Sequence, residues 1–310
     1  MEKAISLSGF MINVKSSTEN RLEIEVDATS LKRAAYKKLV ESLEAILTDI
    51  DKKYSARKGR VRGRSLPINL GGQTLRFSPF PSKFSNTLSN ARTLVYALVA
   101  DYCVLLEEIG RGKVYLLPKG VAPEFLEEIE RVNQETTVPL REEIAKFMRS
   151  DDFHRIEKCM SDSGILFDFH VSTLGNAIDD FSVDIMPVDF GYKYSNINAD
   201  YTLERGKRLK AQLDRKEREY RINIAKDITG KINELVGQPV IGPRLVPRID
   251  RLARMCDSLG LFSISEKVLK PLREIVAARP SERAGLCEKH FGCVDLKRGV
   301  EATLKASFGG

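Results

Sequence analysis

The side chains with the most evident chemical use are basic, and they gather in one run. Between Lys52 and Ala100 the chain has ten Lys or Arg and no Asp or Glu. Like charges this close repel one another unless an anion is near, and each can displace a counterion from a phosphate. The sequence therefore predicts a site for a polyanion such as DNA or RNA. The expected phosphate contacts are Lys52, Lys53, Arg57, Lys58, Arg60, Arg62 and Arg64, with flanking support from Arg76, Lys83 and Arg92.

The neighbouring segment has the opposite charge. Residues 101–190 contain nineteen acidic and nine basic side chains, and residues 159–192 contain no Lys or Arg. Three interpretations follow. The two segments neutralise each other within one molecule, they meet between molecules in a head-to-tail contact, or the basic segment binds nucleic acid.

Asp168 and His170 suggest a second kind of chemistry. They are two residues apart in the predicted strand ILFDFHVST and therefore share one of its faces. Carboxylates with an imidazole can hold Mg²⁺, Mn²⁺ or Zn²⁺ for phosphodiester hydrolysis. A metal-dependent nuclease is therefore one alternative function. The same alternation is also typical of any half-solvated strand.

Cys287, His290 and Cys293 have the spacing C-x2-H-x2-C, which offers three zinc ligands. The usual C-x2-C and H-x3-H pairs of zinc sites are absent. Helical periodicity also explains these residues as core positions. We therefore expect no metal and no cofactor. The odd count of five scattered cysteines indicates reduced thiols rather than disulfides.

Composition excludes several classes of protein. The 310 residues are 42% hydrophobic and 30% charged, which is typical of globular proteins rather than disordered ones. The N-terminal residues do not resemble a signal peptide. The most apolar stretch, 93–106, is shorter than the ~20 residues that span a bilayer. We expect a cytoplasmic protein. The sequence also has no phosphate-binding loop of the G-x-x-x-x-G-K-[ST] type and no recognisable catalytic triad.

The elements that position the basic run belong to a small α+β part. Alternating apolar residues predict strands at 10–14 and 22–26, joined as a hairpin. A helix is expected at 30–54, before the basic run, and a short hairpin at 66–77 after it. A single helix is expected from 82 to 109.

The middle of the chain reads as a strand at 113–117 and two helices at 122–136 and 140–160, separated by Pro139. Two further strands, 165–173 and 181–190, suit a hairpin. From residue 201 onward only helices are expected. They cover 203–236, 248–258, 265–278, 281–290 and 294–308.

The first of these late helices is long, and its apolar residues make a narrow seam close to a coiled-coil pattern. It has eight Lys or Arg between Arg205 and Arg221, against three acids. We interpret this basic face as a solvated arm or a coiled coil more readily than as a nucleic-acid contact. The fold class is therefore α+β, predominantly helical, with a mixed domain at 1–198 and a helical domain at 199–310.

Four segments resemble a bacterial and phage family without an assigned function. They are LSGFMINVK at 7–15, SNARTLVYALVADYCVLLEEIG at 89–110, KVYLLPKGVAPEFLEEIERVNQET at 113–136, and IDRLARMCDSLGLFSISEKVLKPLREIV at 249–276. Members of that family are encoded beside MoxR-type AAA+ ATPases and von Willebrand A-domain proteins. The resemblance implies an accessory role beside an ATPase in a phage or mobile-element context, and it supplies no catalytic residues. The arginines at 57–64 are not part of it.

These observations favour binding or assembly over catalysis. The leading hypothesis is a non-catalytic nucleic-acid-binding protein that uses the basic run. The alternative is a scaffold or adaptor that self-associates or docks on an AAA+ ATPase partner, and the nuclease described above is a second alternative.

Overall fold

A computed structural model describes most of the chain. The described residues are 8–15, 22–55, 63–66, 74–109, 112–165, 182–189 and 204–308. They group by contacts into two compact units. The first unit contains Met1–Val14, Ala97–Glu128 and Val183–Gly310, and the second contains Lys15–Tyr96 and Ile129–Ser182. Both units combine distant segments, so this grouping differs from the division expected between residues 198 and 199.

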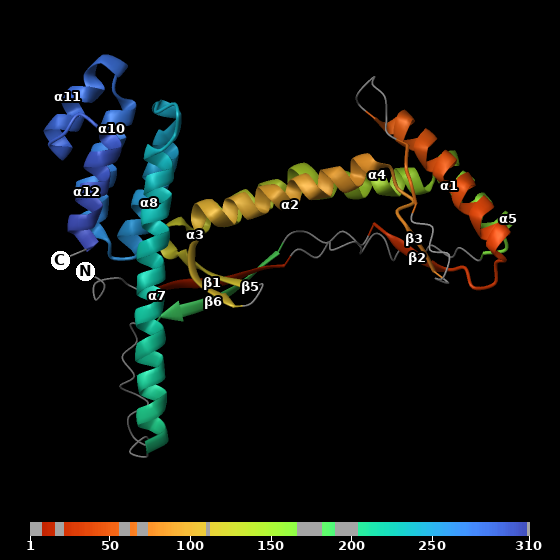
Figure 1. The fold of residues 1–310 in the computed structure, drawn as a ribbon, viewed down its shortest axis with the longest axis horizontal. Coiled ribbons are helices and arrows are strands. Elements are labelled where there is room, and N and C mark those ends of the chain that lie inside the picture. Colours follow the sequence, from red (N-terminus) through yellow and green to blue (C-terminus); the bar gives the residue numbers. More distant parts are fainter. Residues whose placement is uncertain are drawn as a thin grey trace. The chain divides into compact units, whose positions relative to one another are not determined.

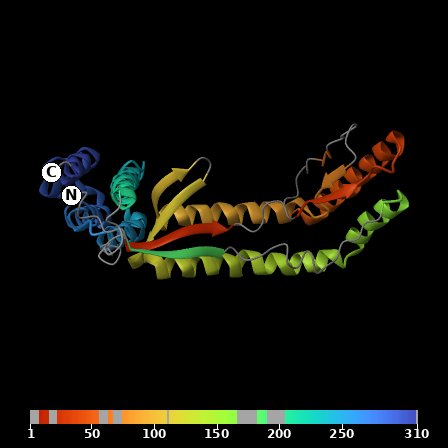
Figure 2. The ribbon, with the colours of Figure 1, turned by 90° about the horizontal axis from the view of Figure 1, so that it is seen from below.

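The first unit contains a four-stranded sheet in the order β4-β5-β1-β6. Its strands are β1 (Ser8–Lys15), β4 (Val104–Ile109), β5 (Gly112–Pro118) and β6 (Ser182–Asp189). β1 pairs antiparallel with β5, with Gly9 opposite Pro118 and Ile12 opposite Tyr115. β6 lies beside β1, and Figure 2 shows the two strands next to each other.

Helices pack on this sheet and on one another. The long helix α7 (Glu204–Val236) packs against β4 and α12, because Ile224, Ile228 and Ile232 recur at every fourth position and are fully buried. The other helical segments of the unit are η2 (Lys119–Val121), the first part of α3 (Ala122–Val132), η5 (Pro243–Leu245), α8 (Val246–Ser258), α9 (Phe262–Ile264), η6 (Ser265–Leu269), α10 (Lys270–Ala277), α11 (Pro280–Phe291) and α12 (Leu296–Phe308) (Figure 1).

The second unit is built around α1 (Arg33–Tyr54). Leu39, Leu43 and Leu47 follow one face of α1 and are buried in its core. The other elements are β2 (Ile24–Asp27), β3 (Thr74–Phe77), the first part of α2 (Ser82–Tyr102), η3 (Asn133–Thr137), α4 (Val138–Met148) and α5 (Asp151–Asp162). α1 packs on α5, and aromatic rings from several elements contact one another in the core of the unit. These rings are Tyr54, Phe80, Phe84, Phe147 and Phe153.

The predominantly helical α+β class is confirmed. The strands expected at 113–117 and 181–190 are present, and the late helices begin and end close to the expected residues. Of the apolar seam of α7, Ile224, Ile228, Ile232 and Leu235 are buried. Within the described residues, no helix combines the length and the apolar character that a bilayer crossing requires.

Three expectations about elements are wrong. β1 and β2 do not form a hairpin, because β1 pairs with β5 and β2 pairs with β3. The helix expected to reach residue 109 ends at Tyr102, and β4 follows, in which Val104 and Leu106 alternate with less buried neighbours. Pro139 does not break the helix, which continues through the π-helical turn η3 into α4. The interruption lies at Arg149–Ser150, where Ser150 caps α5.

Candidate nucleic-acid interface

The basic run leaves the C-terminal end of α1 and then returns along the same helix. The Leu66 amide donates to Glu44 Oε1 at 2.6 Å, and the Arg64 amide donates to Thr48 Oγ1 at 3.0 Å. Glu44 and Thr48 lie one turn apart on α1, and their partners come in the opposite chain order. Residues 63–66 therefore run antiparallel to α1, and both ends of residues 56–62 are attached to that helix. We call residues 56–62 the basic loop.

Arg64 is a largely buried residue that holds the fold together. Its Nε donates to Asp51 Oδ2 at 2.8 Å and its Nη1 to the Ser78 carbonyl at 2.7 Å. Its Nη2 donates to Asp51 Oδ1 at 3.2 Å and also to the Phe80 carbonyl. The two side chains are only 15% and 6% exposed. Most of the guanidinium N–H groups thus have hydrogen-bond partners within the chain. Arg64 therefore stabilises the fold and has few donors left for a phosphate.

Asp51 also fixes the start of α2. The Ser82 amide donates to Asp51 Oδ1 at 2.6 Å, and the Ser82 hydroxyl donates to Asp51 Oδ2 at 2.8 Å. A carboxylate that accepts from the first amide of a helix satisfies a donor that has no partner inside the helix. One carboxylate thus ties the end of α1, the returning chain at Arg64 and the beginning of α2 together.

The acidic segment supplies partners for other cations of the predicted interface. Lys53 Nζ lies 2.5 Å from Asp152 Oδ2 on α5, and Lys83 Nζ lies 2.9 Å from Glu143 Oε2 on α4. The hydrogen bond to Asp152 raises the pKa of Lys53 above its usual value. The interpretation that the two segments neutralise each other within one molecule is confirmed for these two pairs.

The remaining described cations of the interface also have partners. Lys52 lies 3.6 Å from Asp49 Oδ1, and Arg76 Nε lies 2.8 Å from Glu23 Oε2. Arg92 has an interaction within the chain as well. Carboxylates of the same chain therefore compensate five of the expected phosphate contacts, Lys52, Lys53, Arg64, Arg76 and Lys83. Arg57, Lys58, Arg60 and Arg62 lie outside the described residues.

Three basic residues of α7, Arg215, Lys216 and Arg221, have carboxylate partners. Lys216 Nζ lies 2.5 Å from Glu107 Oε1 of β4, and this hydrogen bond lowers the pKa of Glu107. Arg215 Nε lies 3.0 Å from Glu219 Oε1, and Arg221 pairs with Glu217. These contacts favour the interpretation of this face as a solvated helix surface.

The side chains of Cys287, His290 and Cys293 are not arranged as a metal site. Among the described residues, no three His, Cys, Asp or Glu side chains are arranged to hold a metal ion. His290 Nε2 lies 2.8 Å from Glu274 Oε2, and Cys293 Sγ donates to the Asp295 carbonyl. Cys287 is buried, and burial raises the pKa of its thiol. Asp168 and His170 lie outside the described residues, so the nuclease alternative stays a prediction.

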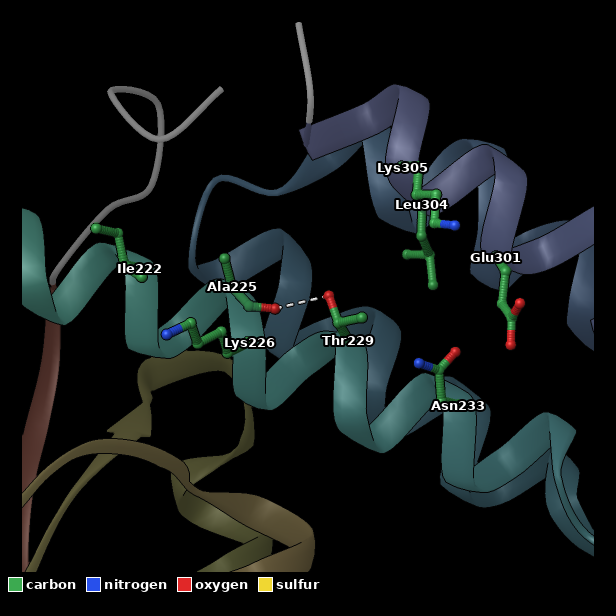
Figure 3. Close-up of a pocket in the computed structure, with 8 residues that line it drawn as sticks. All are labelled: Ile222, Ala225, Lys226, Thr229, Asn233, Glu301, Leu304 and Lys305. Carbon is green, nitrogen blue, oxygen red and sulfur yellow. Dashed lines mark hydrogen bonds between the residues drawn. The ribbon is translucent and has the colours of Figure 1, made fainter.

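The first unit has a groove of ≈ 520 Å³ between α7 and α12 (Figure 3). Ile222, Ala225 and Leu304 give it a mostly apolar surface. Asn233 also lines it, and its side-chain Oδ1 is buried without a hydrogen-bond partner among the described residues. Ile222 is one of the exposed large apolar side chains of the described chain.

Comparisons with protein-family models, curated proteins and solved structures gave no match. The resemblance to the family encoded beside AAA+ ATPases therefore stays a prediction.

Proposed function

We propose that the protein binds the phosphate backbone of nucleic acid through the basic loop. The proposed contacts are Arg57, Lys58, Arg60 and Arg62, which lie within six residues with no acid between them. The observation that carries the proposal is the attachment of both loop ends to α1, through the contacts of Arg64 and Leu66. The loop is thus presented from a fixed base, which lowers the ordering cost of binding.

The paired cations are left out of the proposed interface. The chain's own carboxylates already compensate Lys53, Arg76 and Lys83, whereas the four loop residues have no acid near them in sequence. Closely spaced like charges destabilise the free protein. When they contact phosphates, they displace the counterions that are condensed on the nucleic acid. Binding of this kind depends strongly on salt and little on base sequence.

A comparison of two variants with the same net charge tests the proposal. The loop variant replaces Arg57, Lys58, Arg60 and Arg62 by alanine. The control variant replaces four exposed cations that have carboxylate partners, namely Lys37, Arg76, Lys83 and Lys270. Binding to a fluorescent oligonucleotide at low salt should fall at least about tenfold for the loop variant. The control variant should bind nearly as well as the wild type. Equal losses in both variants would mean that only net charge matters, and no loss in the loop variant would refute the proposal.

A second candidate function is a scaffold or adaptor, and the groove between α7 and α12 favours it. Exposed apolar surface beside a groove is typical of protein contacts, and the resemblance described above implies an AAA+ ATPase as one partner. Apolar association survives high salt, whereas phosphate binding does not. Size-exclusion chromatography of protein free of nucleic acid should show an oligomer that persists at high salt. The substitution Ile222→Glu should dissociate this oligomer. A monomer under both conditions would remove self-association from this candidate.

A further inference from the structure

A second groove, of ≈ 600 Å³, lies between α1 and α5 in the second unit. We call it the α1–α5 groove. It is lined by basic side chains from both helices: Lys38 from α1, and Arg155 and Lys158 from α5. Asp162 is the one acid among its lining residues. Three cations against one anion give the groove a positive balance.

The cations of this groove are available to a ligand. Lys38 and Lys158 are exposed, and neither has an ion-pair partner among the described residues. Arg155 is shared at long range, 3.7 Å from Asp49 Oδ2 and 3.5 Å from Asp152 Oδ1. The contact with Asp49, whose side chain is 57% exposed, contributes little. The Arg155 side chain is itself 49% exposed, so its guanidinium can bind an anion as well. The groove thus differs from the surroundings of Arg64, whose side chain is only 15% exposed.

The groove is continuous with the base of the basic loop. On α1, Ala35, Lys38, Ser42 and Ile46 recur at three or four residues, and Asp49 and Lys53 extend the same stripe. Residues at this spacing share one face of a helix. The pairs Lys53–Asp152 and Arg155–Asp49 show that α5 runs antiparallel beside this stripe. A line along the two helices therefore leads from Lys38 and Lys158 to the end of α1, where the loop begins.

The length of this line selects a polymer over a small anion. Lys38 lies about 24 Å from Tyr54 along the helix, at 1.5 Å rise per residue. One strand of a duplex has a phosphate about every 3.4 Å, so several phosphates fit between the groove and the loop.

We propose that the α1–α5 groove is a second phosphate-binding site for the same nucleic-acid strand that the basic loop contacts. The inference rests on the proposed function, because the strand must reach both places. Lys38 and Lys158 bind phosphate oxygens directly, and Arg155 adds a donor between them and the loop. Asp162 and, farther along α1, Asp49 oppose binding and limit its strength.

Strand length separates the two sites. Removal of both groove lysines, Lys38→Ala with Lys158→Ala, should weaken binding of a single strand of about 16 nucleotides and lower its salt slope by about 1.4. A strand of about four nucleotides is too short to occupy the loop and the groove together, so its affinity should not change. The matched control, Lys37→Ala with Lys270→Ala, removes two exposed cations that pair with Glu41 and Glu266, and it should leave both affinities unchanged.

Cys159 gives a local readout, because it lines the groove and is partly accessible. The long strand should slow its labelling by a maleimide several-fold, while Cys293 in the first unit should label at an unchanged rate. Labelling should not slow with the short strand or with inorganic phosphate. Equal protection of Cys159 by inorganic phosphate would overturn the strand model in favour of a small-anion site, and no protection by any of them would remove the groove from the interface.

Failure of this inference differs from failure of the proposed function. If the four-residue loop variant binds normally while the groove variant is weakened, the groove is the interface and the loop is not. If the loop variant is weakened while the groove variant and Cys159 behave as wild type, the loop acts alone and the inference is wrong.

Discussion

Replacement of Arg64 by alanine should lower the stability of the second unit strongly. Arg64 nevertheless belongs to the basic run that the sequence predicts as a nucleic-acid interface. The change removes the partner of Asp51, which is 6% exposed. Breaking a buried ion pair costs about 3–5 kcal/mol, because the remaining charge is left without compensation. Asp51 keeps its two hydrogen bonds from Ser82. We therefore expect the lower end of that range, about 3 kcal/mol.

Arg76→Ala is the matched control for this change. Arg76 also pairs with a carboxylate at 2.8 Å, but its side chain is 54% exposed and its partner Glu23 is 43% exposed. Exposed pairs of this kind contribute about 0–1 kcal/mol. The two variants remove the same residue type at the same contact distance. They differ in burial and in the number of hydrogen bonds lost, because Arg64 also donates to the Ser78 and Phe80 carbonyls.

Hydrogen exchange followed by mass spectrometry measures the effect in the second unit alone. A loss of about 3 kcal/mol should speed exchange of the core amides of α1 by roughly 100-fold in Arg64→Ala. The increase in Arg76→Ala should be less than about fivefold. If Arg64→Ala exchanges as slowly as Arg76→Ala and loses nucleic-acid binding instead, Arg64 is a ligand-binding residue and its assignment to the fold is wrong.

Four further substitutions test other contacts. Gly120→Ala should destabilise the first unit by about 1–3 kcal/mol, because the new Cβ would lie 2.2 Å from Ser258 Oγ. Gly285→Ala in α11 should stabilise the unit by up to about 1 kcal/mol, because its new Cβ meets no atom within 4 Å. The urea midpoint of unfolding measures both changes. Burial raises the pKa of Asp227, so the charged carboxylate destabilises the fold above that pKa. Asp227→Asn should therefore raise the urea midpoint at pH 7, and this gain should shrink as the pH falls through the raised pKa. A midpoint difference that does not change with pH would contradict this reasoning. Asp162→Asn should tighten nucleic-acid binding up to about fivefold, because an exposed charge pair is worth about 0.2–1 kcal/mol. Fluorescence anisotropy measures the affinity, and unchanged or weaker binding would argue against the groove as a binding site.

Elements with a strong local period could be predicted from the sequence. The seam of α7 and the strand β5 follow patterns within a few residues, so their positions were close to those observed. Strand pairing was not predictable in the same way. The polar segment after β1 suggested a turn, but the partner of β1 is β5, about a hundred residues later, and burial of the whole sheet decides that choice.

The end of α2 shows a second limit. Residues 94–109 are rich in apolar side chains, and such a run does not distinguish a buried helix from a buried strand. Val104 and Leu106 are buried on one face of β4, a two-residue period that the preceding helical pattern concealed.

The charge of the basic run was evident in the sequence, but the partners of its members were not. Asp152 and Glu143 reach Lys53 and Lys83 only because α5 and α4 fold onto the same unit. Asp51 did give a local signal. It follows Leu43, Leu47 and Ile50 on the buried side of α1, and an acid on an apolar face needs a cation as partner.

The salt dependence of duplex binding tests the central claim most directly. Each phosphate contact contributes about 0.9 to the slope of log K against log salt concentration. Loss of Arg57, Lys58, Arg60 and Arg62 should therefore make the slope shallower by about 3–4 between about 50 and 200 mM salt. Parallel lines for the wild type and the loop variant would contradict the account, because they would show that these four side chains displace no counterions from the nucleic acid.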